Sequence, residues 1–355
     1  MIIAGILLLL ITGLAFALLK GAYYPQILQA EPVVKRANSP LLSRQQEIKV
    51  LSYNVQFMAG KGYVFWFDLP NADGPDNQPS AASTHKTIQE LARIINDEQP
   101  DFVLLQEVDD GAKRTQYQDQ LAQLLSLLPD EYSHHASAFY WQSDFVPHPR
   151  VWGAAGMKLS TLSKHPISSA QRHQLALTPA NIFSKHLGIK RAVLETRIPF
   201  REGGEMVLLN THLEAFSKQS DTLQRQVDQV DSILNQLCAQ NSPWLIGGDF
   251  NLLPAGQYQH LPERQQKHYR ANSELTNLSE KYPCIPSRED LQNPHLWYSY
   301  FPNDPEVNKP DRSIDYLFYS PLLSCQAKRI RQQDTLEISD HLPLIASFKL
   351  NAYTP

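Results

Sequence analysis

The sequence has little cysteine, and none of it is arranged for a metal or disulfide framework. Cys238, Cys284 and Cys325 are scattered along 355 residues without a CxxC pair. Thiolate metal sites usually draw on close cysteine pairs, and three cysteines cannot complete a set of disulfides within one chain. We therefore expect buried or free thiols. This argues against a disulfide-stabilised secreted domain and leaves a periplasmic and a cytoplasmic location open.

The chain also lacks a strong excess of charge of one sign. Lys and Arg together number 32 and Asp and Glu 36, which gives a net charge of −4. Strong nucleic-acid binding usually shows a basic footprint, so this balance does not indicate a polyanion binder. A bound metal ion would supply its own positive charge, so a phosphate substrate is not excluded. The sequence has neither a Gly-x-Ser-x-Gly elbow nor a phosphate loop, and a covalent intermediate is not required.

One long hydrophobic run is present, at residues 2–19. Its length is near the lower bound for a membrane-spanning helix, and it has no polar face. A secretory signal peptide is the rival interpretation, but it would begin with basic residues, and none precedes this run. We expect residues 1–20 to be an uncleaved transmembrane helix. Basic residues follow the run and favour a cytoplasmic catalytic domain weakly, so the side of the membrane stays open: Lys20, Lys35, Arg36 and Arg44.

Beyond this run, the pattern predicts a linker at residues 21–46, which contain three prolines, and a single domain at residues 47–355. Short β-like runs alternate with amphipathic helical stretches, which indicates a layered α/β structure. The predicted strands are 48–55, 101–108, 156–163, 191–199, 205–213, 242–250, 313–320 and 341–350. The predicted helices are 84–99, 118–128 and 220–237.

Six polar sites lie where apolar strands end, which is where α/β folds place reactive groups. Asp249 and Asn251 are two apart, so an extended backbone points both side chains to one face, and Gly247 and Gly248 before them allow a close backbone approach. Taken singly, each site has an ordinary structural explanation. Together they supply hard oxygen ligands and two imidazoles, a set that suits Mg²⁺, Mn²⁺ or Ca²⁺ better than zinc. The sites are Asn54, Glu107, His212, Asp249 with Asn251, Asp315, and Asp340 with His341.

The order of these motifs resembles the endonuclease/exonuclease/phosphatase superfamily over about 300 residues, from near Ile48 to Leu350. That superfamily includes pancreatic-type deoxyribonucleases, apurinic endonucleases, neutral sphingomyelinases and inositol-phosphate 5-phosphatases. The resemblance implies a four-layered, two-sheet α/β sandwich of the DNase-like type and a hydrolase that depends on Mg²⁺ or Mn²⁺. It implies that Glu107 is the main metal ligand, with Asn54 beside it, and that Asp340 supports the metal site.

The resemblance also implies roles in the reaction itself. Asp249 and Asn251 would align the attacking water and the phosphoryl oxygens. His212 would contact the phosphate or assist the leaving group. His341 would act as general base or stabilise the pentavalent transition state. Asp315 would orient a histidine, and which histidine it orients stays open at this point.

The substrate is not fixed by these motifs. Aromatic residues gather in two predicted insertions, residues 58–83 and 139–152. They either pack over the sheet ends or form a rim that receives a lipid or stacks a base. The candidates are a lipid headgroup phosphodiester, which the membrane helix favours, and DNA cut by an endonuclease or exonuclease. A soluble phosphomonoester and a non-catalytic membrane-bound binding module are further alternatives. The sequence implies no protein partner.

Overall fold

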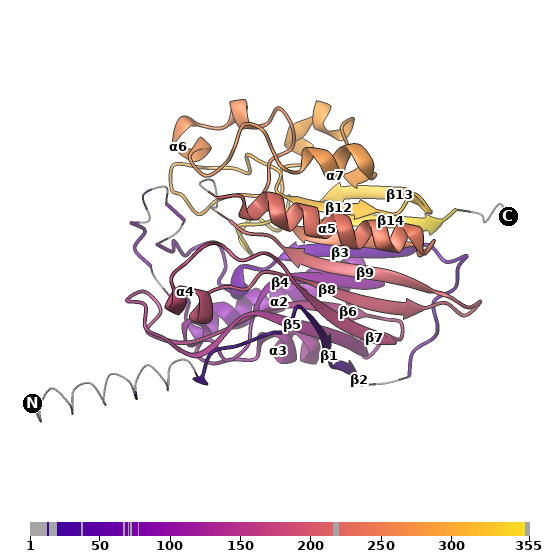
Figure 1. Cartoon of the computed structure of the whole chain (residues 1–355), viewed down its shortest axis with the longest axis horizontal. Helices are drawn as coiled ribbons and strands as arrows, with labels where there is room; N and C mark the ends of the chain where they lie inside the picture. The colour runs from indigo at the N-terminus through magenta and orange to yellow at the C-terminus, as the bar shows by residue number, and fades with distance from the viewer. Residues whose placement is uncertain are drawn as a thin grey trace, which may run out of the picture.

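The structure of the chain is a computed structural model. It describes residues 13, 20–36, 38–66, 68, 69, 71, 73–76, 78–215 and 220–351, with the side chains of 182–184 left aside. Within these residues the strands form two seven-stranded sheets that pack face to face, as Figure 1 shows. Each sheet has one parallel pair at its centre and antiparallel pairs around it, so both sheets are mixed.

The strands of the first sheet, in spatial order, are β13 (Leu323–Ile330), β14 (Leu344–Leu350), β3 (Ile48–Asn54), β4 (Phe102–Asp109), β6 (Gly153–Ser163), β5 (His134–Val146) and β2 (Val33–Lys35). Those of the second sheet are β1 (Leu28–Glu31), β7 (Ser169–Gln174), β8 (Ala192–Pro199), β9 (Glu205–His212), β10 (Trp244–Asp249), β12 (Asp315–Tyr319) and β11 (Cys284–Ile285). The α-helices are α2 (Ala81–Glu98), α3 (Gln120–Leu127), α4 (Ile182–Leu187), α5 (Thr222–Ala239), α6 (Glu263–Gln266) and α7 (Thr276–Lys281). Short 3-10 turns are η1 (Gln56–Met58), η2 (Lys113–Thr115), η3 (Tyr258–His260), η4 (Asp290–Gln292) and η5 (Pro294–Leu296).

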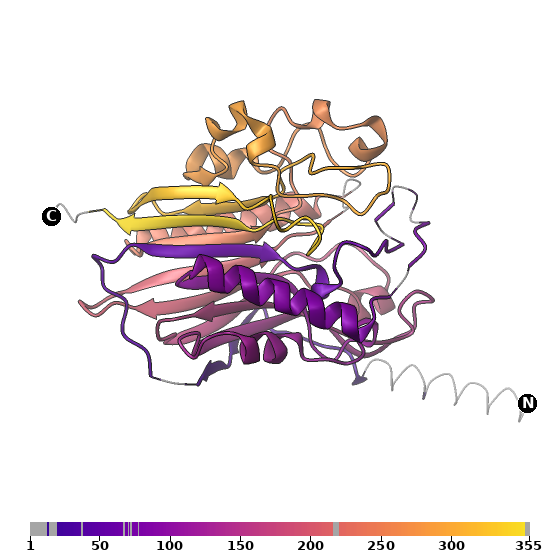
Figure 2. The ribbon, with the colours of Figure 1, turned by 180° about the vertical axis from the view of Figure 1, so that it is seen from behind.

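Helices cover the outer face of each sheet. Leu91 and Ile95 of α2, at helical spacing, pack on Leu105 of the first sheet, and α3 joins the same core. Figure 2 shows α2 lying across that face. On the second sheet, α5 and α7 pack over residues such as Trp244 and Phe318. A further core fills the space between the sheets, and each fully buried Leu or Ile there contributes roughly 1.5–3 kcal/mol to folding. The four-layered sandwich predicted from the sequence is confirmed.

Two predictions about the chain's organisation differ from the structure. Residues 21–46, predicted as a linker, contain the edge strands β1 and β2, which pair with β7 and β5. Residues 139–152, predicted as an insertion, continue β5 as far as Val146. Both segments lack the continuous apolar run that marked the other strands. Edge strands such as β1 and β2 need few apolar residues, and β5 alternates buried and partly exposed positions.

The predicted membrane helix falls on residues 1–20, which, apart from Gly13 and Lys20, lie outside the described residues. Within the part of the chain that is described, no helix has both the length and the apolar character needed to cross a bilayer.

A cluster of charges joins α2 to the first sheet and gives a stability prediction. Glu98 is 5% exposed, and its carboxylate accepts hydrogen bonds from Lys49, Arg329 and Arg331 at 2.6–2.9 Å. Burial raises the pKa of Glu98, but the bonds from Lys49 and Arg329 outweigh it, so the net pKa lies below the ordinary 4.5. A lowered carboxyl pKa stabilises the fold above pH 4.5, and this contribution is lost as the pH falls through the folded-state value.

We therefore expect Glu98→Gln to lower the free energy of unfolding at pH 7 by about 1–3 kcal/mol, because three cations lose their shared partner. Urea denaturation at pH 7 and at pH 4 measures this, and the deficit should shrink at the lower pH. Glu90→Gln on the same helix is the matched control, since Glu90 is 41% exposed and, within the described part of the chain, forms an ion pair only with Arg93. Equal stability of the two variants at pH 7 would contradict this account of Glu98.

Candidate active site

The predicted polar residues meet at one edge of the two sheets because of strand direction. Parallel strands end at the same edge, so the end of β9 places His212 beside Asp249 at the end of β10. β12 runs antiparallel to β10, and its first residue, Asp315, therefore lies opposite Asp249. In the first sheet, β3 and β4 are parallel and bring Asn54 next to Gln106 and Glu107. Residues that are far apart in the sequence are thus neighbours here.

Asp249 is the centre of this cluster. Its Oδ2 atom accepts a hydrogen bond from the side-chain amide of Asn54 at 3.0 Å. The same oxygen lies 3.3 Å from Nε2 of His212 and 3.4 Å from Nε2 of His341. Its Oδ1 atom accepts a bond from the backbone N–H of Asn251 at 2.9 Å. Three side chains from three other segments of the chain therefore converge on one carboxylate.

The local backbone is shaped to present these side chains. At Gly248 φ is +150°, and a Cβ would lie 1.9 Å from the carbonyl oxygen of Thr211, so the close approach predicted for the two glycines is realised at this one. Glu107 has φ +57° at the position where the β4–β6 register shifts. Asn251 has φ +53°. Left-handed conformations at non-glycine residues cost free energy and often occur at functional sites.

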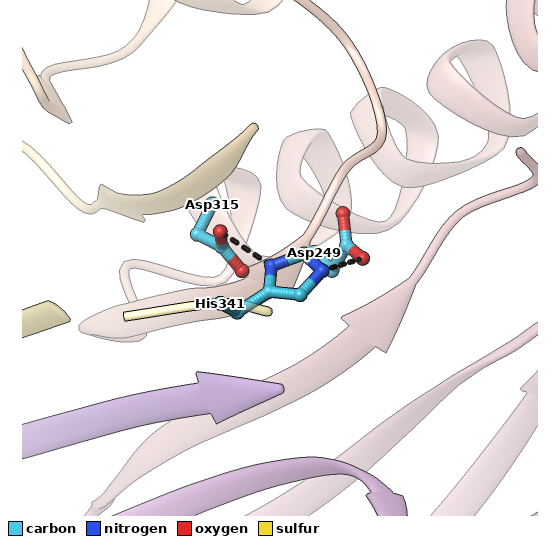
Figure 3. Close-up of side chains that lie close together, drawn as sticks. All are labelled: Asp249, Asp315 and His341. Atoms are coloured by element: carbon cyan, nitrogen blue, oxygen red, sulfur yellow. Dashed lines mark hydrogen bonds and ion pairs between the residues drawn. The ribbon is translucent and has the colours of Figure 1, made fainter. Parts of the chain in front are cut away.

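His341 is held between two carboxylates, as Figure 3 shows. Its Nδ1 lies 2.8 Å from Oδ2 of Asp315, and that carboxylate also accepts a bond from Ser299 Oγ at 2.7 Å. The histidine that Asp315 contacts is therefore His341. Burial by itself lowers the pKa of His341, but the charges of Asp315 and Asp249 outweigh it and raise the pKa to about 10. The ring is thus a cation fixed in orientation at the centre of the cluster.

Two groups of residues could hold a metal ion. Asp249, Asp315 and His341 have ligand atoms within 4.8 Å of one another, but both ring nitrogens of His341 already face a carboxylate, and a cation there would break the bond to Asp315. Glu107 and Asp340 line the same cavity, and Nδ1 of His212 lies 3.8 Å from the Glu107 carboxylate. Burial raises the pKa of Asp340 to about 6, and the nearby Glu107 charge adds to this. Two carboxylates that repel each other are stabilised by a hard cation between them. Glu107 and Asp340 are therefore better candidate metal ligands than Asp249, Asp315 and His341.

His212 lies on the other side of Asp249. Its Nδ1 is 3.4 Å from the hydroxyl of Tyr140, which also accepts the backbone N–H of Glu107 at 3.2 Å. Burial, followed by the positive charge of Arg191, holds the pKa of His212 well below its usual range. His212 is therefore a neutral imidazole, in contrast to the charged His341, and the two histidines are suited to different tasks.

Around the cluster lies a cavity of about 320 Å³. It is lined by six of the eight predicted site residues: Glu107, His212, Asp249, Asn251, Asp340 and His341. Asn54 lies behind them and donates to Glu107 at 3.1 Å, and Asp315 lies behind His341. All eight predicted residues are therefore brought together.

Sequence reasoning missed several residues of the site. The hydroxyl of Tyr140 lies next to His212, and Ser299 donates to Asp315, the partner of His341. Neither residue lies in a motif that marks a strand end. Arg191 lines the cavity and directly precedes β8. Because β8 is antiparallel to β9, its first residues lie at the same edge as the last residues of β9, with Val193 opposite Thr211. Arg191 could have been found from the sequence as a polar residue that directly precedes a strand antiparallel to β9.

A two-sheet sandwich of this topology, with its polar cluster at one edge, defines the class of DNase-like α/β proteins. The sequence pattern of the endonuclease/exonuclease/phosphatase family matches residues 51–341, and the chain belongs to that family. It thus has the phosphoesterase fold of the family, and the resemblance stated from the motifs is confirmed.

Two curated relatives are similar to this chain in sequence. UPF0294 proteins of Yersinia pseudotuberculosis and Yersinia pestis are 23% identical over 217 residues, which is 60% of this chain and 66% of each of those proteins. The match therefore spans slightly less than two thirds of these relatives.

Among solved structures, an endonuclease/exonuclease/phosphatase from Beutenbergia cavernae has a TM-score of 0.61 at 22% identity, covering 87% of this chain and 72% of that one. The human Nocturnin catalytic domain with bound sulfate has a TM-score of 0.55 at 16% identity, covering 90% and 97%. A mannosyl-6-phosphatase of Bacteroides thetaiotaomicron has a TM-score of 0.51 at 15% identity, covering 85% and 99%. These likenesses show the shared fold.

Proposed function

We propose that this protein is a divalent-metal-dependent hydrolase that cleaves a phosphodiester by direct attack of water. The observation that carries the proposal is the convergence on Asp249, whose carboxylate lies within 3.4 Å of Asn54, His212 and His341. An acidic group, a neutral imidazole and a charged imidazole lining one cavity are what a water-driven displacement requires.

Glu107 and Asp340, with Asn54 beside them, would hold the metal. When bound, Mg²⁺ or Mn²⁺ neutralises negative charge on the phosphoryl oxygens and on the departing oxygen. The protein's part is to fix the ligand geometry. Asn54 contributes to this because its amide donates to both Glu107 and Asp249, and so ties the ligand carboxylate to the carboxylate that faces the water.

The remaining residues divide the reaction between them. Burial raises the pKa of Asp249 to about 7 in spite of the opposing charge of His341, so near neutral pH this carboxylate accepts a proton from the attacking water. Of the two roles open for His341, stabilisation of the pentavalent transition state is favoured, since a cationic imidazole donates a proton and does not accept one. Asn251 aligns the phosphoryl group, and His212 contacts the leaving group from the opposite side.

Metal removal tests the proposal. We expect the full chain to hydrolyse bis(p-nitrophenyl) phosphate with Mg²⁺ or Mn²⁺ present, and we expect the rate to fall by at least about 10² after dialysis against EDTA, because the charge on the phosphoryl oxygens is then uncompensated. Adding back Mg²⁺ or Mn²⁺ should restore the rate. Release of p-nitrophenol at 405 nm follows the reaction. Turnover that persists unchanged in EDTA would contradict metal dependence.

We also propose that residues 1–20 tether this hydrolase to a membrane, which brings lipid headgroup phosphodiesters within reach as substrates. The support is the apolar run at residues 2–19 of the sequence. Fractionation of expressing cells tests it: the full chain should stay with membranes after a carbonate wash. Recovery in the soluble fraction would contradict the tether and leave the hydrolase proposal intact.

A further inference from the structure

The cavity that holds the reactive cluster also has an apolar stretch of wall. This stretch is formed by aromatic and aliphatic side chains from β5, from β6, from the segment before β8 and from two loops, and the guanidinium of Arg114 lies among them, 5.8 Å from the ring of Trp141. These side chains are Phe65, Trp66, Trp141, Val151, Ile189 and Met157. An apolar surface that adjoins a reaction centre removes the apolar part of a ligand from water.

Hydrogen bonds hold part of this apolar wall next to the reactive cluster. The indole N–H of Trp141 donates to the carbonyl of Leu187 at 2.9 Å, which fixes the orientation of the ring. The backbone N–H of Lys190 donates to the carbonyl of Tyr140 at 2.5 Å. Tyr140, adjacent to Trp141 in β5, contacts His212. The strand that carries Trp141 thus also carries Tyr140, which lies behind His212.

Arg191 lines the same cavity and has hydrogen-bond donors that are not used by any described residue. Its side chain is 5% exposed, and the buried Nε and Nη1 atoms have no hydrogen-bond partner in the described part of the chain. The nearest carboxylate, Glu214, is 3.7 Å from Nε, too far for a hydrogen bond. Burying unsatisfied donors on a charged group is costly, so their presence in the cavity wall points to an anionic ligand that accepts from them.

We propose that Trp141 and Ile189 form a subsite for an apolar group carried by the phosphoester substrate, with a phosphoryl oxygen placed on Arg191. This rests on the proposed hydrolase function and adds the class of substrate: a small phosphoester with one apolar substituent of about the size of a ring. A cavity of about 320 Å³ is at the lower end of the range for small-molecule sites. A duplex nucleic acid would leave this wall unused.

Two non-hydrolysable phosphonates test the subsite. In the Mg²⁺-loaded full chain, phenylphosphonate should bind at least about tenfold more tightly than methylphosphonate, because only its ring reaches the wall. Isothermal calorimetry gives both dissociation constants, and competition against bis(p-nitrophenyl) phosphate checks that both occupy the reactive cavity. Equal affinities, or binding of neither phosphonate to a chain that shows Mg²⁺-dependent hydrolysis, would overturn the subsite.

Two variants test whether Trp141 and Ile189 cause the preference for the phenyl group. Trp141→Ala and Ile189→Gln should each reduce the phenyl-to-methyl affinity ratio at least about threefold to fivefold, and Ile189→Gln keeps side-chain volume so that folding is preserved. Trp152→Ala is the matched control, because Trp152 is 59% exposed and does not line the cavity. A ratio unchanged in both wall variants refutes the placement. Absence of metal-dependent hydrolysis with the phenyl preference intact would instead count against the proposed function alone.

Discussion

Replacing Asp249 by Asn is expected to lower kcat/KM for bis(p-nitrophenyl) phosphate by about 10²–10⁴, the range for loss of a general base. Asn has the same shape and can still accept the backbone N–H of Asn251, so the fold should be retained. It cannot take a proton from water. In the native protein three groups compete for this carboxylate within 3.4 Å, and burial raises its pKa to about 7. The single change therefore removes the centre of the cluster without leaving a cavity.

The pH profile separates this role from a structural one. In the native protein the rate should rise as the pH is raised through about 7, since Asp249 must lose its proton before it can accept one. The Asp249→Asn variant should lack this limb. Asp231→Asn, on the exposed side of α5 and paired with Lys281, is the control and should keep native activity. Native activity in Asp249→Asn would remove this carboxylate from the mechanism.

The second large expected effect is that of Glu107→Gln on the Mg²⁺ requirement. We expect the concentration of Mg²⁺ needed for half-maximal activity to rise at least about 10–100-fold, because a neutral amide replaces the main anionic ligand and changes of even outer partners weaken metal sites by that much. Hydrolysis rates over a series of Mg²⁺ concentrations measure the shift. Glu131→Gln, an exposed carboxylate that pairs with Lys164, should show the native curve. A native Mg²⁺ requirement in Glu107→Gln would place the metal elsewhere.

Much of the site could be predicted from the sequence because its residues end strands with continuous apolar runs. Such runs indicate both the strand and the end at which its polar residues emerge, as for Glu107 near the end of β4 and Asp249 at the end of β10. The glycine before Asp249 was predictable for the same local reason. The pairing of Asp315 with His341 was not, since it depends on which segments are neighbours in space, and it is seen only in the hydrogen bond between the two side chains.

What escaped the sequence was set by long-range packing. The full length of β5 could not be predicted from the sequence, because about half of its residues are partly exposed. It is defined by its pairing with β6. Tyr140 on β5 and Arg191 before β8 have no motif around them, and their importance comes from lying next to His212. The edge strands β1 and β2 are held mainly by backbone pairing, which any sequence without a strong helical preference can supply, and Val33 adds a contact with the core.

The position of the metal is the most direct test of the whole arrangement. Crystals soaked in Mn²⁺ and measured at the manganese absorption edge should show one strong anomalous peak at bonding distance from the carboxylate of Glu107, with Asp340 and Asn54 around it. The Asp315–His341 hydrogen bond should remain intact. A peak bonded to His341 and Asp315, or none at Glu107, would contradict a reaction centre built around Glu107 and Asp249.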